Sequence, residues 1–271
     1  ILLSATEADS IPKFINIGSN ICIDYRNNED ETSNRVQLNT VYSTKRDKLE
    51  TLSDLLKYLG DKSSIVFLNY RESVIRTAIY LQEEGFSVSI FHGGLEQKER
   101  EAMLYQFSNG STNILVSTNL GARGLDIPDV DNIIHYHFPE NEDEYIHRVG
   151  RTARWDKCGN IYFLLGPDEQ LPNYINQKVD VMELPDVLPT IKPARMSTLY
   201  IGKGKKDKIS KGDIVGFLCK KAGVERMDIG KIDVMPRFSY VAVSRTKISQ
   251  ILKMTKGEKI KGISTVVEEV K

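Results

Sequence analysis

The stretch from Glu144 to Arg154 reads E-Y-I-H-R-V-G-R-T-A-R. Arg148, Arg151 and Arg154 recur every three residues, so a helix would bring them to one face. Guanidinium groups on one face repel one another unless an anion lies opposite, and their planar forks suit phosphate oxygens. The stretch therefore predicts either an anion-binding face or a solvated basic helix, and the choice depends on the sequence around it.

Four other short patterns precede this stretch along the chain. They are Ser4-Ala5-Thr6, the S-I-V-F-L-N of residues 64–69, His92-Gly93-Gly94-Leu95 followed by Gln97 and Arg100, and the S-T-N-L-G-A-R-G-L-D of residues 117–126. They resemble motif III, motif IV, the H-G-G and Q-x-x-R elements, and motif V of DEAD-box RNA helicases, and residues 147–154 resemble motif VI. Each pattern is a weak signal alone. With five of them in the family's order, the chain is identified as a member of that family.

The resemblance implies that ATP, with Mg²⁺, binds between two RecA-like lobes. Arg151 and Arg154 match the family's arginine fingers, which stabilise the negative charge that develops during phosphoryl transfer. Asp126 matches the carboxylate that accepts hydrogen bonds from the ribose, and Gly124 lets the backbone approach the nucleotide. A turn or helix-cap carboxylate is the alternative role for Asp126. We expect Arg148 to pair internally or with the first lobe, and we expect the Mg²⁺ ligands in that lobe.

The RNA contacts that the resemblance implies in this lobe are to the phosphate backbone, and such contacts position a strand without reading its sequence. They are expected from Gly93, Gly94, Arg100, Thr118, Gly121 and Arg123. An exposed helical cation is the alternative role for Arg100. Asn119 stands where the family usually has aspartate and Ala153 where it usually has glycine, which leaves the details of motifs V and VI open.

Short apolar runs alternate with amphipathic stretches between residues 36 and 165. The pattern predicts strands at residues 36–42, 65–68, 88–91, 114–117, 132–136 and 161–165, and helices at residues 45–59, 73–84, 96–109 and 142–149. This alternation indicates an α/β fold with a parallel sheet, which the resemblance specifies as RecA-like. Ligands of such folds bind beyond the carboxyl ends of the strands. We expect His135 and His137 to serve packing or hydrogen bonding.

The chain opens on an apolar run, Ile1-Leu2-Leu3, that no cap or turn precedes. We interpret residues 1–9 as the remnant of a first RecA-like lobe and residues 10–184 as the second lobe. The sequence contains neither a G-x-x-x-x-G-K-[ST] phosphate-binding loop nor a D-E-A-D run, which the family places in the first lobe. We therefore expect the chain to lack half of the ATP site and to be inactive by itself.

Three prolines mark a linker, which we place at residues 185–196. Residues 197–271, called the tail below, predict strands at residues 198–201, 229–234, 240–244 and 263–268 and helices at residues 212–222 and 247–254. This β-α-β-β-α-β order is the ferredoxin-like plan of RRM domains. The L-Y-I-G of residues 199–202, K-K-D-K-I of 205–209, G-D-I-V-G of 212–216, I-G-K-I of 229–232 and K-I-K-G of 259–262 resemble the RNA-binding domain of DbpA-type helicases. The resemblance implies a hairpin of large-subunit ribosomal RNA as target, and hence a role in ribosome assembly.

The formal net charge of zero hides an opposition between the two parts of the chain. Residues 193–271 contain 18 Lys and Arg against 8 Asp and Glu, whereas the first 192 residues contain 19 against 29. A basic tail favours binding to polyanions, although a solubilising surface is the alternative. The candidate RNA contacts are Lys203, Lys205, Lys206, Lys208, Lys211, Arg237, Lys259 and Lys261. Phe238 and Tyr240 share one face of a predicted strand, where core packing is favoured over the base stacking of usual RRM domains.

Cys22, Cys158 and Cys219 lie far apart, which favours a reducing cytoplasm over a zinc site or a disulfide framework. No apolar run approaches the roughly 20 residues that span a bilayer. The sequence thus predicts the carboxyl-terminal part of an ATP-dependent RNA helicase, with RNA and a first RecA-like lobe as partners. The alternatives are an RNA-binding module that acts without ATP and a DNA helicase, which the RNA-type tail disfavours.

Overall fold

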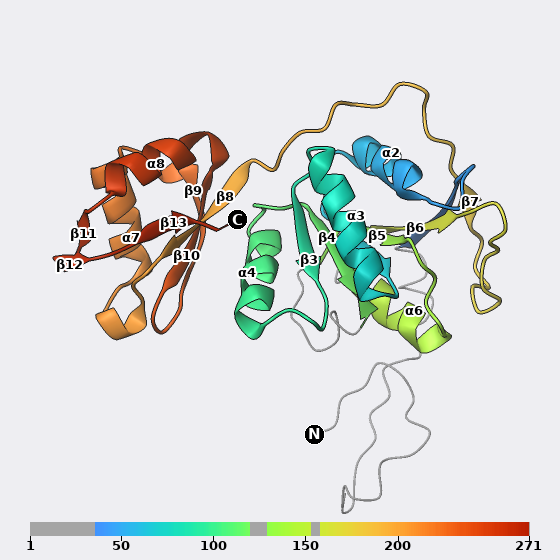
Figure 1. The fold of residues 1–271 in the computed structure, drawn as a ribbon, viewed down its shortest axis with the longest axis horizontal. Coiled ribbons are helices and arrows are strands. Elements are labelled where there is room, and N and C mark those ends of the chain that lie inside the picture. Colours follow the sequence, from blue (N-terminus) through green and yellow to red (C-terminus); the bar gives the residue numbers. More distant parts are fainter. Residues whose placement is uncertain (1–35, 120–128, 153–157, 271) are drawn as a thin grey trace, which may run out of the picture.

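The computed structural model describes residues 36–119, 129–152 and 158–270 (Figure 1). Its larger sheet has seven strands in the order β3-β4-β2-β5-β6-β1-β7. They are β1 (Val36–Tyr42), β2 (Ser64–Leu68), β3 (Val88–Phe91), β4 (Ile114–Thr118), β5 (Asn132–His135), β6 (Gly159–Leu165) and β7 (Asp180–Val181). All neighbouring strands run parallel, so the parallel sheet predicted from the sequence is confirmed.

Helices cover both faces of this sheet. They are α2 (Leu49–Leu59), α3 (Arg71–Glu83), α4 (Gln97–Ser108) and α6 (Glu142–Val149). Leu55 of α2 and Val74 of α3 belong to the core cluster on one face. Phe107 of α4 belongs to the cluster on the other face, and Tyr145 of α6 packs against it. Because both faces are covered, every residue of β2, β4 and β5 is buried, which explains their continuous apolar runs.

Helix α2 begins four residues later than predicted, at Leu49. The residue before it, Lys48, is buried, and its backbone N–H donates to the Tyr136 hydroxyl at 3.2 Å. That contact fixes the turn that leads into the helix.

Helix α6 has the predicted bounds. The Asn141 side chain accepts a hydrogen bond from the Glu144 N–H at 2.9 Å, and the helix ends at Gly150. Arg151 therefore lies in the turn beyond the helix. A common helix face for Arg148, Arg151 and Arg154 would require the helix to continue past Gly150, and because it does not, Arg151 does not share the face of Arg148. Arg154 lies outside the described residues.

The tail forms an antiparallel sheet in the order β13-β8-β10-β9, with β8 (Met196–Ile201), β9 (Ile229–Val234), β10 (Ser239–Ser244) and β13 (Val267–Glu269). Helices α7 (Lys211–Phe217) and α8 (Ile248–Thr255) cover one face, and a π-helical segment at Leu218–Ala222 continues α7. Ile214 of α7 and Ile251 of α8 share a core with Leu199 and Val241 of the sheet. The β-α-β-β-α-β order is confirmed.

The predicted last strand, residues 263–268, is interrupted in the structure. Ile263–Ser264 (β12) pairs instead with Lys259–Ile260 (β11) in a small hairpin. The two residues of its turn, Lys261 and Gly262, both have positive φ, as in the tight turns that match the twist of paired strands. Only Val267–Glu269 joins the main sheet.

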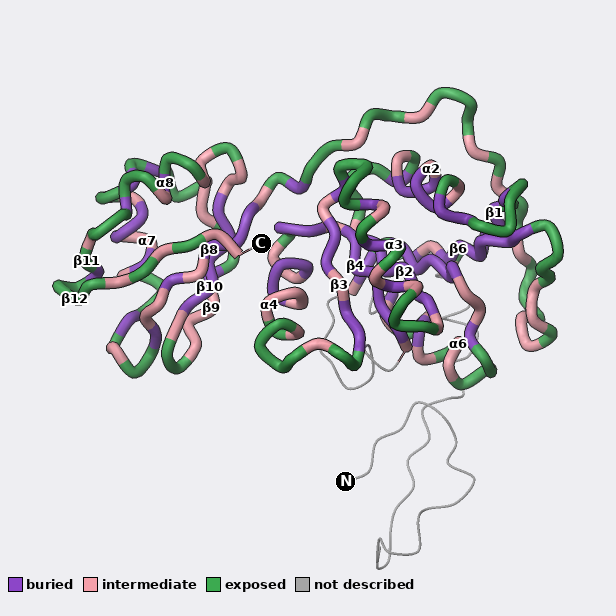
Figure 2. Tube along the Cα trace, viewed as in Figure 1, coloured by how far each residue is buried: buried purple, intermediate pink, exposed green. Residues whose placement is uncertain are grey.

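The segment between the two sheets runs along the lobe (Figure 1). Most of its residues are exposed or half-buried (Figure 2), but Met182, Leu184 and Ile191 pack against the lobe core. We keep residues 10–184, 185–196 and 197–271 as proposed boundaries of lobe, linker and tail; residues 1–9 lie outside the described ranges. Within those ranges, no helix is both long and apolar enough to cross a membrane.

Candidate functional site

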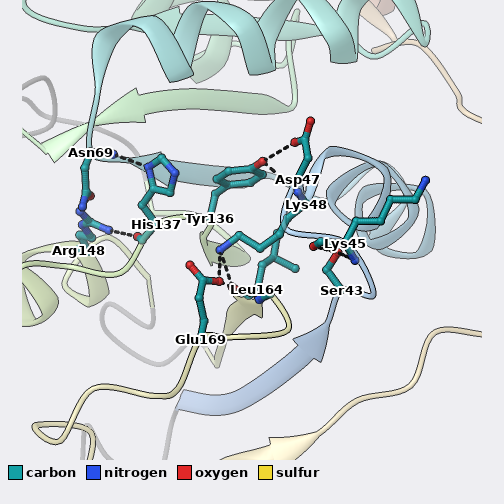
Figure 3. Close-up of polar contacts among 11 residues, drawn as sticks. Ser43, Lys45, Asp47, Lys48, Asn69, Tyr136, His137, Arg148, Leu164 and Glu169 are labelled. Carbon is teal, nitrogen blue, oxygen red and sulfur yellow. Dashed lines mark hydrogen bonds and ion pairs between the residues drawn. The ribbon is translucent and has the colours of Figure 1, made fainter.

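The centre of the lobe's site is Arg148, whose side chain is only 1% exposed. Its Nε donates to Asn119 Oδ1 at 2.8 Å and its Nη2 to Asn69 Oδ1 at 2.9 Å. Its Nη1 donates to the His137 carbonyl at 2.8 Å (Figure 3). One guanidinium thus joins α6 to the segments that follow β4, β2 and β5. Helix α6 carries residues of motif VI, the segment after β4 carries Asn119 of motif V, and the segment after β2 carries Asn69 of motif IV. The expectation of internal pairing for Arg148 is confirmed.

The described hydrogen-bond acceptors of Arg148 are all neutral. Burial lowers the pKa of Arg148 to about 10, so the guanidinium remains charged at neutral pH. The Phe67 ring lies 5.0 Å from its central carbon and adds a cation–π contact. Asn119, which replaces the usual aspartate, offers Nε an amide oxygen where a carboxylate would offer a counter-charge.

Two histidines complete this network. His135 is fully buried, and its Nδ1 lies 3.3 Å from Arg148 Nη1. Burial and the neighbouring Arg148 hold the pKa of His135 well below its ordinary value, so the ring is neutral. His137 Nδ1 accepts from the Asn69 N–H at 3.2 Å. The predicted packing and hydrogen-bonding roles of His135 and His137 are confirmed.

A second polar cluster, which the sequence did not reveal, lies beside the first (Figure 3). Lys48 Nζ lies 2.6 Å from Glu169 Oε2 and donates to the Leu164 carbonyl at 3.0 Å. A cavity of about 340 Å³ adjoins this pair and is also lined by Arg46, Asp47, Arg76, Tyr136 and His137. Burial lowers the pKa of Lys48, although Glu169 opposes the shift. Both charges are satisfied within the protein, so the pair serves to hold β6 and the start of α2 together.

The loop after β3 carries the predicted RNA contacts Gly93 and Gly94. A Cβ on Gly93 would meet nothing within 4 Å, whereas one on Gly94 would lie 2.5 Å from Arg71 Nη1. The absence of a side chain at Gly94 thus lets the Arg71 guanidinium lie against the loop. Arg71, the first residue of α3, is a cation at this edge that sequence reasoning missed; its position two residues after motif IV was the available signal.

The other predicted RNA contacts of the lobe are only partly described. Arg100 Nε donates to the Leu95 carbonyl at 2.9 Å, so part of its guanidinium supports the loop before α4. Thr118 ends β4 and is 8% exposed. Gly121, Arg123, Gly124, Asp126 and Ala153 lie, like Arg154, outside the described residues.

The backbone around Arg151 is held firmly. Its N–H donates to the Arg148 carbonyl and its carbonyl accepts from the Val130 N–H, both at 3.1 Å. Thr152, the next residue, forms a parallel bridge with Val130. The backbone that carries the predicted arginine finger is therefore fixed to Val130, in the segment that leads into β5.

The predicted cations of the tail lie at its surface. Lys205, Lys206, Lys208, Lys211, Arg237, Lys259 and Lys261 are exposed or half-buried. Lys203 is half-buried, with its Nζ 3.4 Å from Asp207, and Lys261 pairs with Asp213 at 2.8 Å. Two neighbouring hollows of about 500 and 580 Å³ follow strand β9 and share Lys211. Arg226 and Lys231 also line the first hollow, and sequence reasoning missed both.

Three aromatic residues of the tail, Tyr200, Phe238 and Tyr240, lie on the sheet face opposite its helices, whereas Phe217 of α7 belongs to the tail core. The Tyr240 ring centroid lies 5.1 Å from that of Phe238 and 6.1 Å from that of Tyr200. Tyr240 is 3% exposed but belongs to no part of the tail's core; its ring lies 4.9 Å from Tyr105 of the lobe. Tyr240 is therefore buried, as predicted, but not in the tail core: its ring packs against Tyr105 of the lobe.

These features define a class of protein. A RecA-like lobe whose motif IV, V and VI segments meet at one arginine, followed by a basic ferredoxin-like unit, is the architecture that the resemblance to DEAD-box helicases implies for a second lobe and its RNA-binding tail. Two family models match in this order: the helicase conserved C-terminal domain at residues 47–156 and the DbpA RNA binding domain at residues 198–269. The chain belongs to the DbpA-like DEAD-box RNA helicases.

Individual relatives agree with this assignment. The ATP-dependent RNA helicase DbpA of Escherichia coli is 34% identical over 226 residues, which cover 81% of this chain and 50% of that protein. The Bacillus subtilis protein of the same name is 28% identical over 259 residues, covering 85% and 54%. The chain thus spans about half the length of these relatives. The solved structure of the E. coli DEAD-box protein SrmB, bound to regulator of ribonuclease activity A, matches with a TM-score of 0.52 and 29% identity, over 58% of this chain and 96% of that one.

Proposed function

We propose that this chain forms the second lobe and RNA-binding tail of an ATP-dependent RNA helicase that unwinds or remodels structured RNA. The observation that carries the proposal is the Arg148 network. It ties motif IV, V and VI segments into one unit at the carboxyl ends of the strands, where α/β folds bind their ligands. A lobe built this way can present several loops to a nucleotide and to an RNA backbone at once.

For ATP, the residues of this chain supply charge and shape rather than a general base. Bound ATP contributes a γ-phosphate whose transfer spreads negative charge over its oxygens, and a positioned arginine that stabilises this charge accelerates the reaction by roughly 10³–10⁵. We assign that role to Arg151 and Arg154, ribose binding to Asp126, and close backbone approach to Gly124. The fixed backbone at Arg151 fits this role because it orients the start of the side chain. Mg²⁺ ligands belong, in this proposal, to a first lobe.

For RNA, the proposal divides the work between lobe and tail. The loop backbone at Gly93, Gly94 and Gly121, with Arg100, Thr118 and Arg123, meets the phosphates of one strand. The tail cations hold a hairpin, and by the family resemblance this is a hairpin of large-subunit ribosomal RNA. The protein would then act in ribosome assembly, in the cytoplasm.

The test is binding of the 271-residue chain to ribosomal RNA hairpins and to scrambled hairpins at matched salt concentrations. We expect tight binding to one hairpin and weaker binding to all others. In the double variant Lys205→Ala/Lys206→Ala, the salt dependence should flatten by roughly 0.7–0.9 logarithmic units for each phosphate that the variant no longer neutralises. The matched control, Lys253→Ala/Lys256→Ala on and after α8, removes the same charge and should keep the slope.

Equal binding to every hairpin would overturn a specific ribosomal target. An unchanged slope in the Lys205→Ala/Lys206→Ala variant would remove these residues from the interface. The proposed role in ATP hydrolysis is tested in a protein that carries both lobes. If Arg151→Ala loses RNA-stimulated ATP hydrolysis but still binds the hairpin, the result supports the proposal of a helicase. Hairpin binding without any RNA-stimulated hydrolysis in the parent would favour the alternative, an RNA-binding module that acts without ATP.

A further inference from the structure

The two faces of the tail sheet contact different parts of the molecule. Along β8 and β10, Leu199, Ile201, Val241 and Val243 enter the tail's own core. Because side chains alternate along a strand, the residues between them, Thr198, Tyr200, Tyr240 and Ala242, occupy the opposite face. In RRM-like folds this outer face is where bases stack on aromatic rings.

Helix α4 of the lobe covers this outer face. The Tyr105 hydroxyl lies 2.9 Å from the Tyr240 carbonyl and 3.0 Å from the Lys231 carbonyl. The Tyr105 ring is 4.9 Å from the Tyr240 ring, and Lys231 Nζ lies 5.5 Å from the Tyr105 ring centroid. Tyr105 is 6% exposed although it belongs to neither core cluster of the lobe, so its burial comes from the tail.

Polar contacts surround this aromatic pair. Gln106 Nε2 donates to the Val270 carbonyl at 2.8 Å, and Asn109 Nδ2 donates to Thr198 Oγ1 at 2.8 Å. The Ser111 and Thr198 hydroxyls lie 2.8 Å apart. The contacts thus reach β8, β10 and the chain after β13, which is most of the width of the sheet (Figure 1).

The end of the linker is fastened to the same region by other groups. The Ala194 N–H donates to Ser87 Oγ of the lobe at 3.0 Å. Arg245 of the tail donates through Nε to the Ala194 carbonyl at 2.6 Å. Its Nη2 lies 3.0 Å from the Ser111 carbonyl and 2.9 Å from the Met196 carbonyl. One tail arginine therefore binds the linker, the first residue of β8 and the loop after α4 together.

We propose that the outer face of the tail sheet is a docking surface for the chain's own helix α4, so that lobe and tail move as one body. Rings that would stack on bases in other RRM-like sheets hold Tyr105 instead. RNA then meets the tail from the hollows between α7 and β9, where Lys205, Lys211 and Arg226 lie.

If the proposed function holds, the docking also fixes the distance between the RNA strand bound by the lobe and the hairpin bound by the tail. The loop before α4 carries Gly93 and Gly94, and Arg100 lies in the first part of the helix, whereas Tyr105 lies in its last turn. A 12-residue helix is roughly 18 Å long. The strand held by the lobe and the hairpin held by the tail therefore keep a fixed separation.

The first test measures docking without RNA. Spin labels at residues 83 and 249, both exposed and on α3 and α8, report the lobe–tail distance in the 271-residue chain with its three cysteines replaced by serine. We expect one narrow distance distribution in the parent and at least a doubling of its width in Tyr105→Ala. The matched control, Tyr42→Ala, removes a 60% exposed ring from the lobe surface and should stay narrow.

A broad distribution in the parent, or an unchanged one in a folded Tyr105→Ala variant, would overturn the docking. If circular dichroism shows that Tyr105→Ala is unfolded, Tyr105→Phe, which removes only the hydroxyl, replaces it and should broaden the distribution less. Because this test involves no RNA, its failure leaves the proposed function standing.

The second test uses a protein with both lobes and substrates in which a spacer separates the hairpin from the duplex. Unwinding by the parent should show an optimum spacer, with rates falling about threefold or more on either side, because a rigid joint fixes one span. Tyr105→Ala should flatten this dependence while hairpin affinity stays within about twofold. A flat dependence in the parent would overturn the fixed separation.

Discussion

Arg148 in the lobe and Lys211 in the tail carry the same charge in opposite surroundings. Arg148 is 1% exposed, and the protein supplies an acceptor to each of its three nitrogens. Lys211 is exposed at the start of α7 and lines both hollows along β9. The comparison teaches that a cation whose donors are satisfied internally organises the fold, whereas a cation whose donors face solvent is available to a ligand.

The difference has an energetic basis. Moving a charge out of water costs several kcal/mol unless hydrogen bonds replace its hydration. Arg148 meets this condition with oxygens from segments that follow three different strands, so each segment depends on the others. In the proposed function, this arrangement couples the loops assigned to the nucleotide and to RNA through one residue.

The largest effect should come from removing the buried cation. Arg148→Ala leaves the Asn69 and Asn119 oxygens without their donor and opens a cavity, so the free energy of unfolding should fall by about 3–5 kcal/mol. Urea denaturation of the 271-residue chain measures it. The control Arg46→Ala removes an 88% exposed guanidinium paired with Asp168 and should cost at most about 1 kcal/mol. Similar losses in both variants would contradict the comparison.

A smaller effect of opposite sign is expected from Asn119→Asp, which restores the usual family residue beside Arg148 Nε. A hydrogen bond to a charged group is stronger than one to an amide, so the free energy of unfolding should rise by about 1–2 kcal/mol at neutral pH. The control is Asn160→Asp, at a side chain that donates to Asn132 Oδ1, and it should give no gain.

The pH dependence of this gain identifies its cause. Arg148 should hold the pKa of the introduced carboxyl in the folded state below its unfolded value of roughly 3.9. The gain is therefore complete above the unfolded pKa and is lost as pH falls through the folded pKa. A gain that persists after the introduced carboxylate has been protonated would show that its charge is not the source.

Local signals in the sequence predicted much of the fold and less of the site. The bounds of α6 follow from Asn141 and Gly150, which lie next to the helix they delimit. The hairpin of β11 and β12 could have been found from Lys261-Gly262. The hydrogen-bond partners of Arg148 could not have been predicted, because Asn69 lies 79 residues away and no local pattern links the two residues. The contact between the tail sheet and α4 could not have been predicted either, because Tyr105 and Tyr240 are 135 residues apart in the sequence.

The smallest effect on stability should come from Lys211→Ala. The residue is exposed, so the free energy of unfolding should change by less than about 0.5 kcal/mol. RNA binding should respond instead: the logarithmic salt slope for the hairpin should fall by roughly 0.7–0.9 if Lys211 meets one phosphate. Lys253→Ala on α8 is the matched control and should alter neither quantity. If Lys211→Ala lowers the free energy of unfolding but leaves the salt slope of RNA binding unchanged, Lys211 stabilises the fold as Arg148 does. The distinction between the two regions would then be wrong.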